Sequence, residues 1–204
     1  MKSVRRKDRS DSDRDDKPQN FHGEQFSNKT HQSRTDPDSR LARKGPGKET
    51  KLSYHGNLLI DNRGGFCIEA EVVHATGTAE FEGVERMVVA AKNSGFEIKT
   101  LGADKNYHTQ RMVTFLRGRK IAPHFSLHSK RSTIGLDKRT TNTMGYAMSQ
   151  GRRTQIEGRF GWLKRIGGLR KTRFRGIPKN NSLFKLILSA FNILRLIKLT
   201  PVTA

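Results

Sequence analysis

The chain has 204 residues, enough for one domain with an additional arm, and its 40 Lys and Arg against 19 Asp and Glu give a net charge of +21. Such an excess of positive charge favours a polyanionic partner, either nucleic acid or an anionic membrane surface. Charge alone does not identify a function, because many basic proteins share this excess. The single cysteine, Cys67, excludes an intrachain disulfide and fits a reducing cytoplasm. The seven histidines show no spacing typical of a zinc site.

The chain divides by composition at about residue 48. Residues 1–47 carry few apolar side chains and many charges of both signs. Such a segment buries too little surface to offset the entropy of ordering it, so it is predicted to be a disordered polar tail. Residues 48–200 hold the apolar pattern and are predicted to form the folded domain.

The first predicted elements of this domain are a hairpin and a helix. Residues 52–60 and 66–73 are rich in strand formers, and the Asp, Asn and Gly residues at 61–65 between them are typical of a hairpin turn. A helix follows that Thr78 can cap and that ends at Gly95, with apolar residues at helical spacing. The remaining predicted elements are a strand at 98–103, a helix at 108–116, a strand at 121–127, a polar loop at 130–144, a helix at 146–165 and a final helix at 182–199.

The final helix is strongly apolar, which raises the alternative of a membrane span. Its polar interruptions are Lys185, Asn192, Arg195 and Lys198. A span needs about 20 predominantly apolar residues, and central charges are costly there. Packing into the core is therefore favoured over membrane insertion.

Charge is unevenly distributed along the domain. Residues 51–110 carry 6 basic and 8 acidic side chains, whereas residues 111–180 carry 18 basic and only 2 acidic, which are Asp137 and Glu157. The second stretch is predicted to bind DNA in a salt-sensitive way. Its proposed phosphate contacts are Arg153, Lys164, Arg170, Lys171, Arg173 and Arg175.

Two acids stand out as candidates for chemistry. Asp104 follows the strand at 98–103, and Glu157 lies on the helix at 146–165. At about 100° per residue, Arg153 and Lys164 share a narrow face with Glu157. The structural alternatives are a solvated salt bridge between Arg153 and Glu157, and an ordinary turn at Asp104.

The functional hypothesis joins these residues in one site. Mg²⁺ binds one or two carboxylates and completes its shell with water and phosphate oxygens, and paired ions can activate a nucleophile and stabilise a leaving oxygen. Asp104 and Glu157 would be the metal ligands and catalytic acids, while Arg153 and Lys164 would hold phosphates. Such sites require a third carboxylate, which these segments do not supply.

Residues 29–200 also resemble the C-terminal portion of insertion-sequence transposases of the DDE class. The resemblance rests on the order and spacing of short segments, which are Thr35–Asp38, Arg43–Gly45, Gly47–Glu49, Ala75–Glu80, Gly102–Lys105, Arg139–Thr141, Gly145–Tyr146, Ser149–Gln150, Ile156–Lys164 and Gly168–Arg173. It implies an α/β fold of the RNase H-like kind, with a mixed sheet and flanking helices. It also implies cleavage of DNA at transposon ends and strand transfer, with Mg²⁺ or Mn²⁺ as cofactor.

The resemblance assigns positions within the family's motifs. Asp104 resembles the second acid of the triad and Glu157 the third, while Arg153 and Lys164 match the basic residues of the signature around that glutamate. Gln150 stands where this signature opens with tyrosine, and Asn106 and His108 also depart from the family pattern.

The first acid of the triad has no counterpart in this sequence. In the family it lies on a central strand shortly before a polar segment like residues 1–28, so the domain at 48–200 is expected to be truncated and inactive alone. Transposon ends and target DNA are the implied partners. Two further partners stay open, a second copy of the chain and a transposase half encoded upstream. The implied location is the bacterial cytoplasm at the nucleoid. The competing hypothesis is a DNA-binding regulator without catalytic activity, since binding alone needs no Mg²⁺.

Overall fold

A β-hairpin forms the centre of the computed structural model, which describes residues 4–7, 27–43, 45, 48–77, 79–127 and 135–200. Its strands β4 (Lys51–Ile60) and β5 (Cys67–His74) are antiparallel, with a register irregularity at Leu59 and Ile60. The connecting turn includes Gly65 at φ +74°, a conformation that side chains other than glycine rarely adopt. The hairpin prediction is confirmed.

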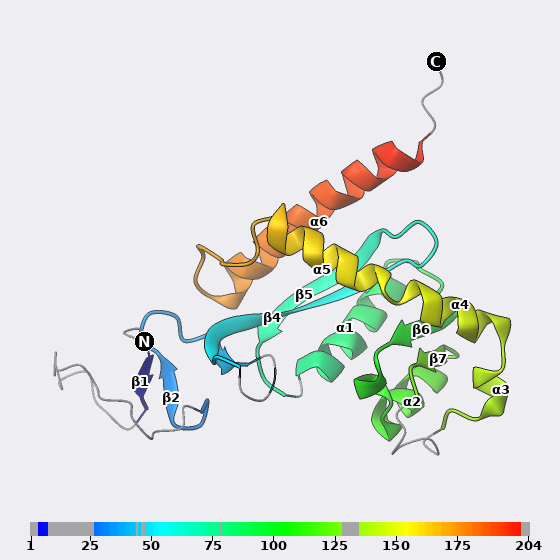
Figure 1. Ribbon diagram of the computed structural model, residues 1–204, viewed down its shortest axis with the longest axis horizontal. Helices are drawn as coiled ribbons and strands as arrows, with labels where there is room; N and C mark the ends of the chain where they lie inside the picture. The colour runs from blue at the N-terminus through cyan, green and yellow to red at the C-terminus, as the bar shows by residue number, and fades with distance from the viewer. Residues whose placement is uncertain are drawn as a thin grey trace.

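Helices cover both faces of this hairpin, giving a mixed α/β fold (Figure 1). Helix α1 (Ala79–Asn93) lies on one face, and it ends where Gly95 adopts φ +87°. Thr78, the predicted cap of this helix, lies outside the described residues. Helices α5 (Gln155–Arg165) and α6 (Ile177–Leu199) lie on the other face. The core on that side contains Leu58, Cys67, Ala70, Val72, Leu163, Phe184 and Leu188.

A second unit lies beside the hairpin. Strands β6 (Thr100–Ala103) and β7 (Ala122–Phe125) are parallel, and α2 (Gln110–Arg117) connects them after the short 3₁₀ helix η1 (Lys105–Tyr107). Its core, shared with α1, contains Val88, Leu101, Met112, Val113, Leu116, Ile121, Phe125 and Leu136. Within the described ranges this pair of strands is not hydrogen-bonded to β4 or β5.

The polar segment 1–47 is ordered where the structure describes it, which differs from the predicted disorder. Strand β1 (Val4–Arg6) pairs with β2 (His31–Ser33), and β3 (Arg40–Ala42) pairs with the start of β4. Strand pairing and side-chain hydrogen bonds stabilise these residues, and the low apolar content of the segment did not predict such contacts. Residues 8–26 of the predicted tail lie outside the described part.

The segment that follows β2 also organises the start of α6. The Asp38 Oδ2 atom accepts a hydrogen bond from the Ile177 amide at 2.9 Å, and Asp36 Oδ1 accepts one from the Gly176 amide at 3.2 Å. The Tyr54 hydroxyl accepts a second bond from Gly176 at 2.9 Å and donates to Asp36. These acceptors satisfy amides that a helix N-terminus leaves free, so α6 begins at Ile177, five residues before the predicted start.

Helix α6 also closes the outer edge of β5. The Asn192 side chain accepts from the Cys67 amide and donates to the Cys67 carbonyl, both at 2.8 Å, and Asn181 accepts from the Val72 amide at 3.0 Å. No helix in the described part of the chain is long and apolar enough to cross a membrane.

Two predictions in the C-terminal half are wrong. The predicted loop at 130–144 contains a short helix, α3 (Lys138–Thr141), which Asp137 caps; residues 130–134 of this loop are not described. The predicted helix at 146–165 is two helices, α4 (Met144–Arg152) and α5. Where the two helices meet, the amides of Ile156 and Glu157 donate to carbonyls three residues earlier in the chain. A 3₁₀-type turn therefore interrupts the α-helical pattern there.

Candidate functional site

Asp104 directly follows β6, as the sequence predicted, and it lies at the surface. Its side chain caps η1 by accepting a hydrogen bond from the Lys105 amide at 2.7 Å. The side chain is 56% exposed, so it keeps access to solvent while its position is fixed by the strand and the turn. The sequence had left open that Asp104 serves in an ordinary turn, and this hydrogen bond is such a contact. It uses Oδ1 and leaves Oδ2 able to bind another group.

An ion pair joins Asp104 to the junction between α4 and α5. Arg153 Nη1 lies 2.8 Å from Asp104 Oδ1, the same oxygen that accepts from Lys105. The Arg153 Nε atom is buried, and no described residue forms a hydrogen bond with it. The salt bridge between Arg153 and Glu157 that the sequence offered as an alternative does not form in the described structure, because the guanidinium reaches across to β6 instead.

Glu157 lies in the first turn of α5, one turn beyond Arg153, and is exposed. No hydrogen bond or ion pair links it to Asp104 or to any other side chain in the described ranges. A carboxylate in the first turn of a helix is stabilised by the positive end of the helix dipole. Glu157 is therefore an exposed carboxyl group without a partner in the described ranges, and it lies four residues after Arg153, which holds Asp104.

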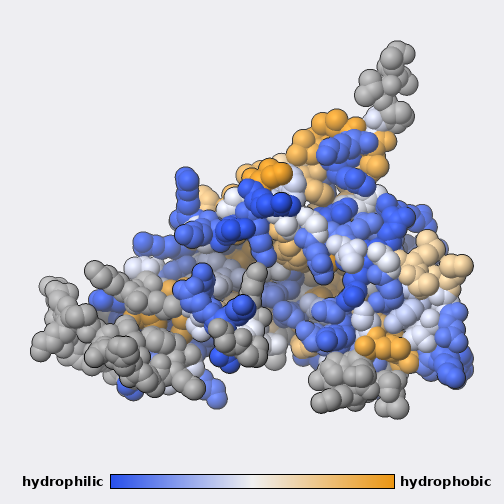
Figure 2. Space-filling model, in the orientation of Figure 1, coloured by the Kyte–Doolittle hydropathy of each residue, from blue (hydrophilic) through white to orange (hydrophobic). Residues whose placement is uncertain are grey.

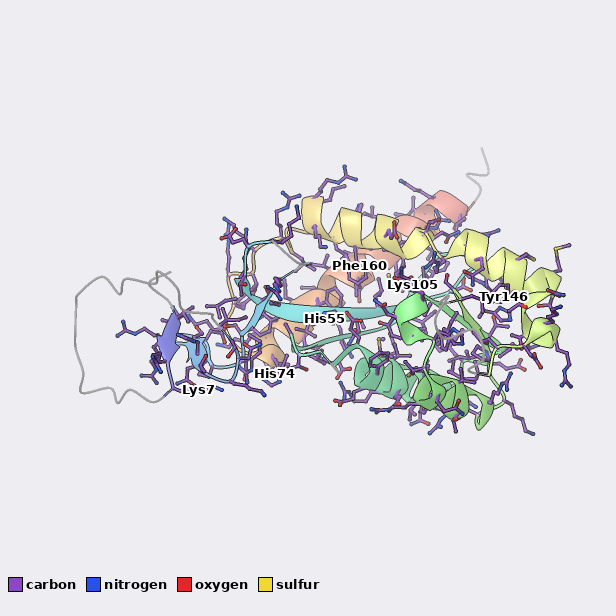
Figure 3. The ribbon with its side chains drawn as sticks, turned by 60° about the horizontal axis from the view of Figure 1, so that its bottom comes forward. Lys7, His55, His74, Lys105, Tyr146 and Phe160 are labelled. Atoms are coloured by element: carbon purple, nitrogen blue, oxygen red, sulfur yellow. The ribbon has the colours of Figure 1, made fainter. Side chains whose placement is uncertain are left out.

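Lys164 lies near the end of α5, where its ammonium is 5.8 Å from the centre of the Phe160 ring. The sequence predicted that Arg153, Glu157 and Lys164 share one narrow helix face. Because Arg153 precedes the 3₁₀-type turn, only Glu157 and Lys164 share that face on α5. Figure 3 labels Phe160 on α5, Lys105 beside Asp104 and Tyr146 on α4, the three elements around the candidate site. The ring of Trp162 packs edge-on against Phe191 of α6 at 5.1 Å, which assigns that tryptophan to the core.

A polar network fixes α4 against β7 and thereby positions Arg153. Gln150 Nε2 donates to the His124 carbonyl at 2.8 Å, and its Oε1 accepts from the Ser126 hydroxyl at 2.7 Å. His124 Nδ1 bonds to the Ser149 hydroxyl at 2.7 Å, with both side chains buried, and burial lowers the pKa of His124. Sequence reasoning missed this network, because Ser149 and Gln150 entered it only as one of the segments that carry the family resemblance.

The loop between α5 and α6 concentrates unpaired positive charge. Its basic residues, all exposed, are Arg170, Lys171, Arg173 and Arg175. In the described ranges none of them lies within ion-pair distance of an acid. The acids of α1, by contrast, are paired: Glu85 with Arg111 at 2.7 Å, and Glu82 with Arg86 at 3.9 Å. The basic loop therefore presents a cluster of exposed cations without acid partners in the described part of the chain.

Metal binding at this site would depend on few ligands. The described residues contain no group of three or more His, Cys, Asp and Glu side chains placed to hold a metal ion. Asp104 and Glu157 have the oxygen donors that Mg²⁺ prefers, and Mg²⁺ often takes only one or two carboxylates from protein. The two carboxyl groups are thus of the type that Mg²⁺ binds. In this structure Arg153 forms an ion pair with one of them, Asp104.

Comparison with known families gives a match in the C-terminal half of the chain. Residues 116–197 match the family described as a transposase DDE domain. This segment runs from the end of α2 to near the end of α6, and it includes Arg153, Glu157, Lys164 and the basic loop but not Asp104. The resemblance to a DDE transposase is confirmed, while the match does not separate the insertion-sequence groups. No curated protein and no solved structure matches the chain.

Proposed function

Because residues 116–197 match the transposase DDE domain family, we propose that this protein acts in DNA transposition, cutting and joining DNA strands at the ends of a mobile element. The observation that supports this most is the ion pair between Asp104 and Arg153, since it ties the end of β6 to the junction at which α5, the helix with Glu157, begins. The substrate would be DNA, and the chain would act in the cytoplasm on nucleoid DNA. The insertion-sequence class of transposases stays part of the proposal.

In the proposed site, Asp104 and Glu157 are the carboxylates that hold Mg²⁺ or Mn²⁺. The bound ion would lower the pKa of a coordinated water and stabilise the oxygen leaving phosphorus. Arg153 would compete with the ion for Asp104 Oδ1, and its guanidinium could instead pair with two oxygens of a phosphate. Lys164 would bind a further phosphate as a point charge.

The basic loop would hold the DNA on either side of the reacting phosphate. Phosphate contacts give affinity and position without reading the sequence. Arg170, Lys171, Arg173 and Arg175 suit this role, because they are exposed and free of acid partners in the described structure. The same feature supports the second candidate function, a regulator that competes for transposon DNA without cutting it.

We further propose that the RNase H-like sheet is completed by a strand outside this sequence, which carries the first acid of the triad. Strands β6 and β7 form a sheet separate from β3, β4 and β5 in the described structure, so each sheet has an edge on which such a strand could pair. Two carboxylates alone would hold paired ions poorly. The chain by itself is therefore expected to bind DNA but not to cleave it.

The test uses three versions of the protein: the chain alone, the chain with the upstream strand and its Asp, and the same extension with Asn in place of Asp. We expect Mg²⁺-dependent nicking of a transposon-end duplex only in the second. In that version, Asp104→Asn and Glu157→Gln should each abolish nicking while DNA affinity stays within about twofold, since an amide keeps the shape but loses the charge. Full nicking by either variant would exclude that residue as a ligand. Nicking by the unextended chain would show that the missing-strand proposal is wrong.

A melting curve gives a readout that does not depend on cleavage. Mg²⁺ should raise the melting temperature of the extended protein, because a ligand that binds only the folded state stabilises it. The rise should be smaller in Asp104→Asn and Glu157→Gln. DNA binding by all versions without nicking or metal response in any would instead favour the regulator.

A further inference from the structure

Helix α6 carries an apolar stripe that nothing in the described structure covers. Leu186, Ile193 and Ile197 are 68%, 60% and 63% exposed, and Ala190 between them is exposed as well. Free aliphatic side chains of this size are normal singly, but a continuous row of them marks a contact surface. In Figure 1 the C-terminal half of α6 projects beyond the sheet, and Figure 2 shows hydrophobic side chains gathered over that part.

The stripe has the spacing of a helix–helix seam. Its members follow one another at intervals of four, three and four residues, and at about 100° per residue they fall within about 60° of the helix circumference. The opposite side of α6 is the one that packs on the core, through Phe184 and Leu188. The stripe therefore faces away from the rest of the chain.

The order of large and small residues makes the stripe complementary to itself in one orientation. When two copies of α6 lie antiparallel around a twofold axis between positions 191 and 192, Leu186 faces Ile197 of the second copy. The small Ala190 then faces the large Ile193. Facing a large side chain with a small one lets the two layers interdigitate, and a twofold arrangement uses this fit twice.

Charges agree with this arrangement. Lys185, Arg195 and Lys198 lie about 100° or more from the middle of the stripe, so no cation enters the seam. Lys185 is instead directed to Glu69 of β5, at 3.8 Å. Lys179 also lies on the line of the stripe, but about two turns before Leu186, so it stays outside the seam.

We infer that the outer face of α6 is a dimerisation surface, on which a second copy of this chain docks antiparallel through Leu186, Ala190, Ile193 and Ile197. The contact is small for a stable interface, so the dimer is weak and depends on protein concentration. The two copies also repel each other, because each has a net charge of +21. Added salt therefore strengthens the dimer by screening this repulsion, whereas it weakens DNA binding.

Sedimentation equilibrium of the whole chain over a range of concentrations tests the inference. We expect a monomer–dimer equilibrium that shifts towards the dimer as salt rises. Ile193→Glu should raise the dissociation constant at least tenfold, because a carboxylate would be buried against Ala190 of the other copy. The double variant Ala190→Lys with Ile193→Glu should restore dimerisation, since each new lysine then faces a glutamate. Ser189→Ala on the same helix is the matched control, and circular dichroism checks that every variant is folded.

Cross-linking distinguishes the orientation. The native thiol of Cys67 is buried, which raises its pKa to about 11 and makes it unreactive at neutral pH. Mixing Leu186→Cys protein with Ile197→Cys protein should give a disulfide-linked dimer, whereas each protein alone should give little. Efficient cross-linking of either one alone would show a parallel arrangement and overturn the inference. A wild-type chain that stays monomeric at every concentration and salt level would overturn it too, including the case in which α6 instead binds lipid vesicles or a different protein.

Discussion

Replacing Asn192 by alanine should destabilise the protein through the edge of β5. The Asn192 amide group makes two hydrogen bonds to the backbone of Cys67, each 2.8 Å long, across 125 residues of sequence. A neutral hydrogen bond contributes about 1 kcal/mol net, and leaving partly buried backbone groups without partners adds to its loss. The free energy of unfolding should therefore fall by about 2 kcal/mol.

Urea unfolding followed by circular dichroism measures this loss. For a protein of this size the expected fall corresponds to a midpoint lower by about 1 M urea, with an unchanged slope. Ser189→Ala is the control, because Ser189 is an exposed residue of the same helix and bonds only to the Lys185 carbonyl. Its effect should stay within about 0.5 kcal/mol. If Asn192→Ala unfolds at the same urea concentration as Ser189→Ala, the two bonds do not hold α6 on the sheet.

Three further predictions concern the start of α6, the candidate site and the basic loop. The hydrogen bond from the Ile177 amide is the largest cause that lowers the pKa of Asp38 below its ordinary value of 3.8. The ionised carboxylate therefore stabilises the fold fully above pH 3.8, and this stabilisation is lost as the pH falls through the lower pKa of the folded state. Because Asp38 is 39% exposed, this effect should amount to at most ~1 kcal/mol of unfolding free energy. In melting curves the wild type should lose that stability in acid, whereas Asp38→Asn, which is already less stable at neutral pH, should not. Arg153→Ala should lower stability by no more than ~1 kcal/mol in urea unfolding, because its partner Asp104 is largely exposed, and a loss of several kcal/mol would mean that the pair is structural rather than replaceable by a metal ion. Alanine at Arg170, Lys171, Arg173 and Arg175 together should reduce the slope of log affinity against log salt by up to about 4 in fluorescence anisotropy, with no change in sequence preference; an unchanged slope would place the DNA elsewhere.

Elements defined by local pattern were predictable from the sequence. The hairpin has strand formers on both sides of a turn rich in glycine, and α1 has apolar residues at helical spacing before Gly95. The interruption between α4 and α5 was not predictable, because Thr154 is no helix breaker and keeps right-handed helical dihedral angles. The ion pair of Arg153 with Asp104, which lies next to this turn, is a tertiary contact that the local sequence does not reveal.

Contacts between distant segments explain the other differences. The start of α6 depends on Asp36 and Asp38, about 140 residues earlier, which no pattern within the helix reveals. Arg153 binds Asp104 at a separation of 49 residues, although the sequence also offered it Glu157 four residues away. For the site, the positions of the two acids at a strand end and in a helix could be predicted, whereas the ion pair that links their elements required the structure.

The hydrogen bonds from Asn181 and Asn192 to β5 have a consequence for biosynthesis. A ribosome releases β5 long before α6, so the outer edge of the hairpin stays open while more than a hundred further residues are made. An open edge strand is a template for pairing with another chain. Loss of the last helix through an early stop codon or a protease would leave that edge exposed permanently. Shortened forms of this protein should therefore accumulate as aggregates rather than as soluble fragments.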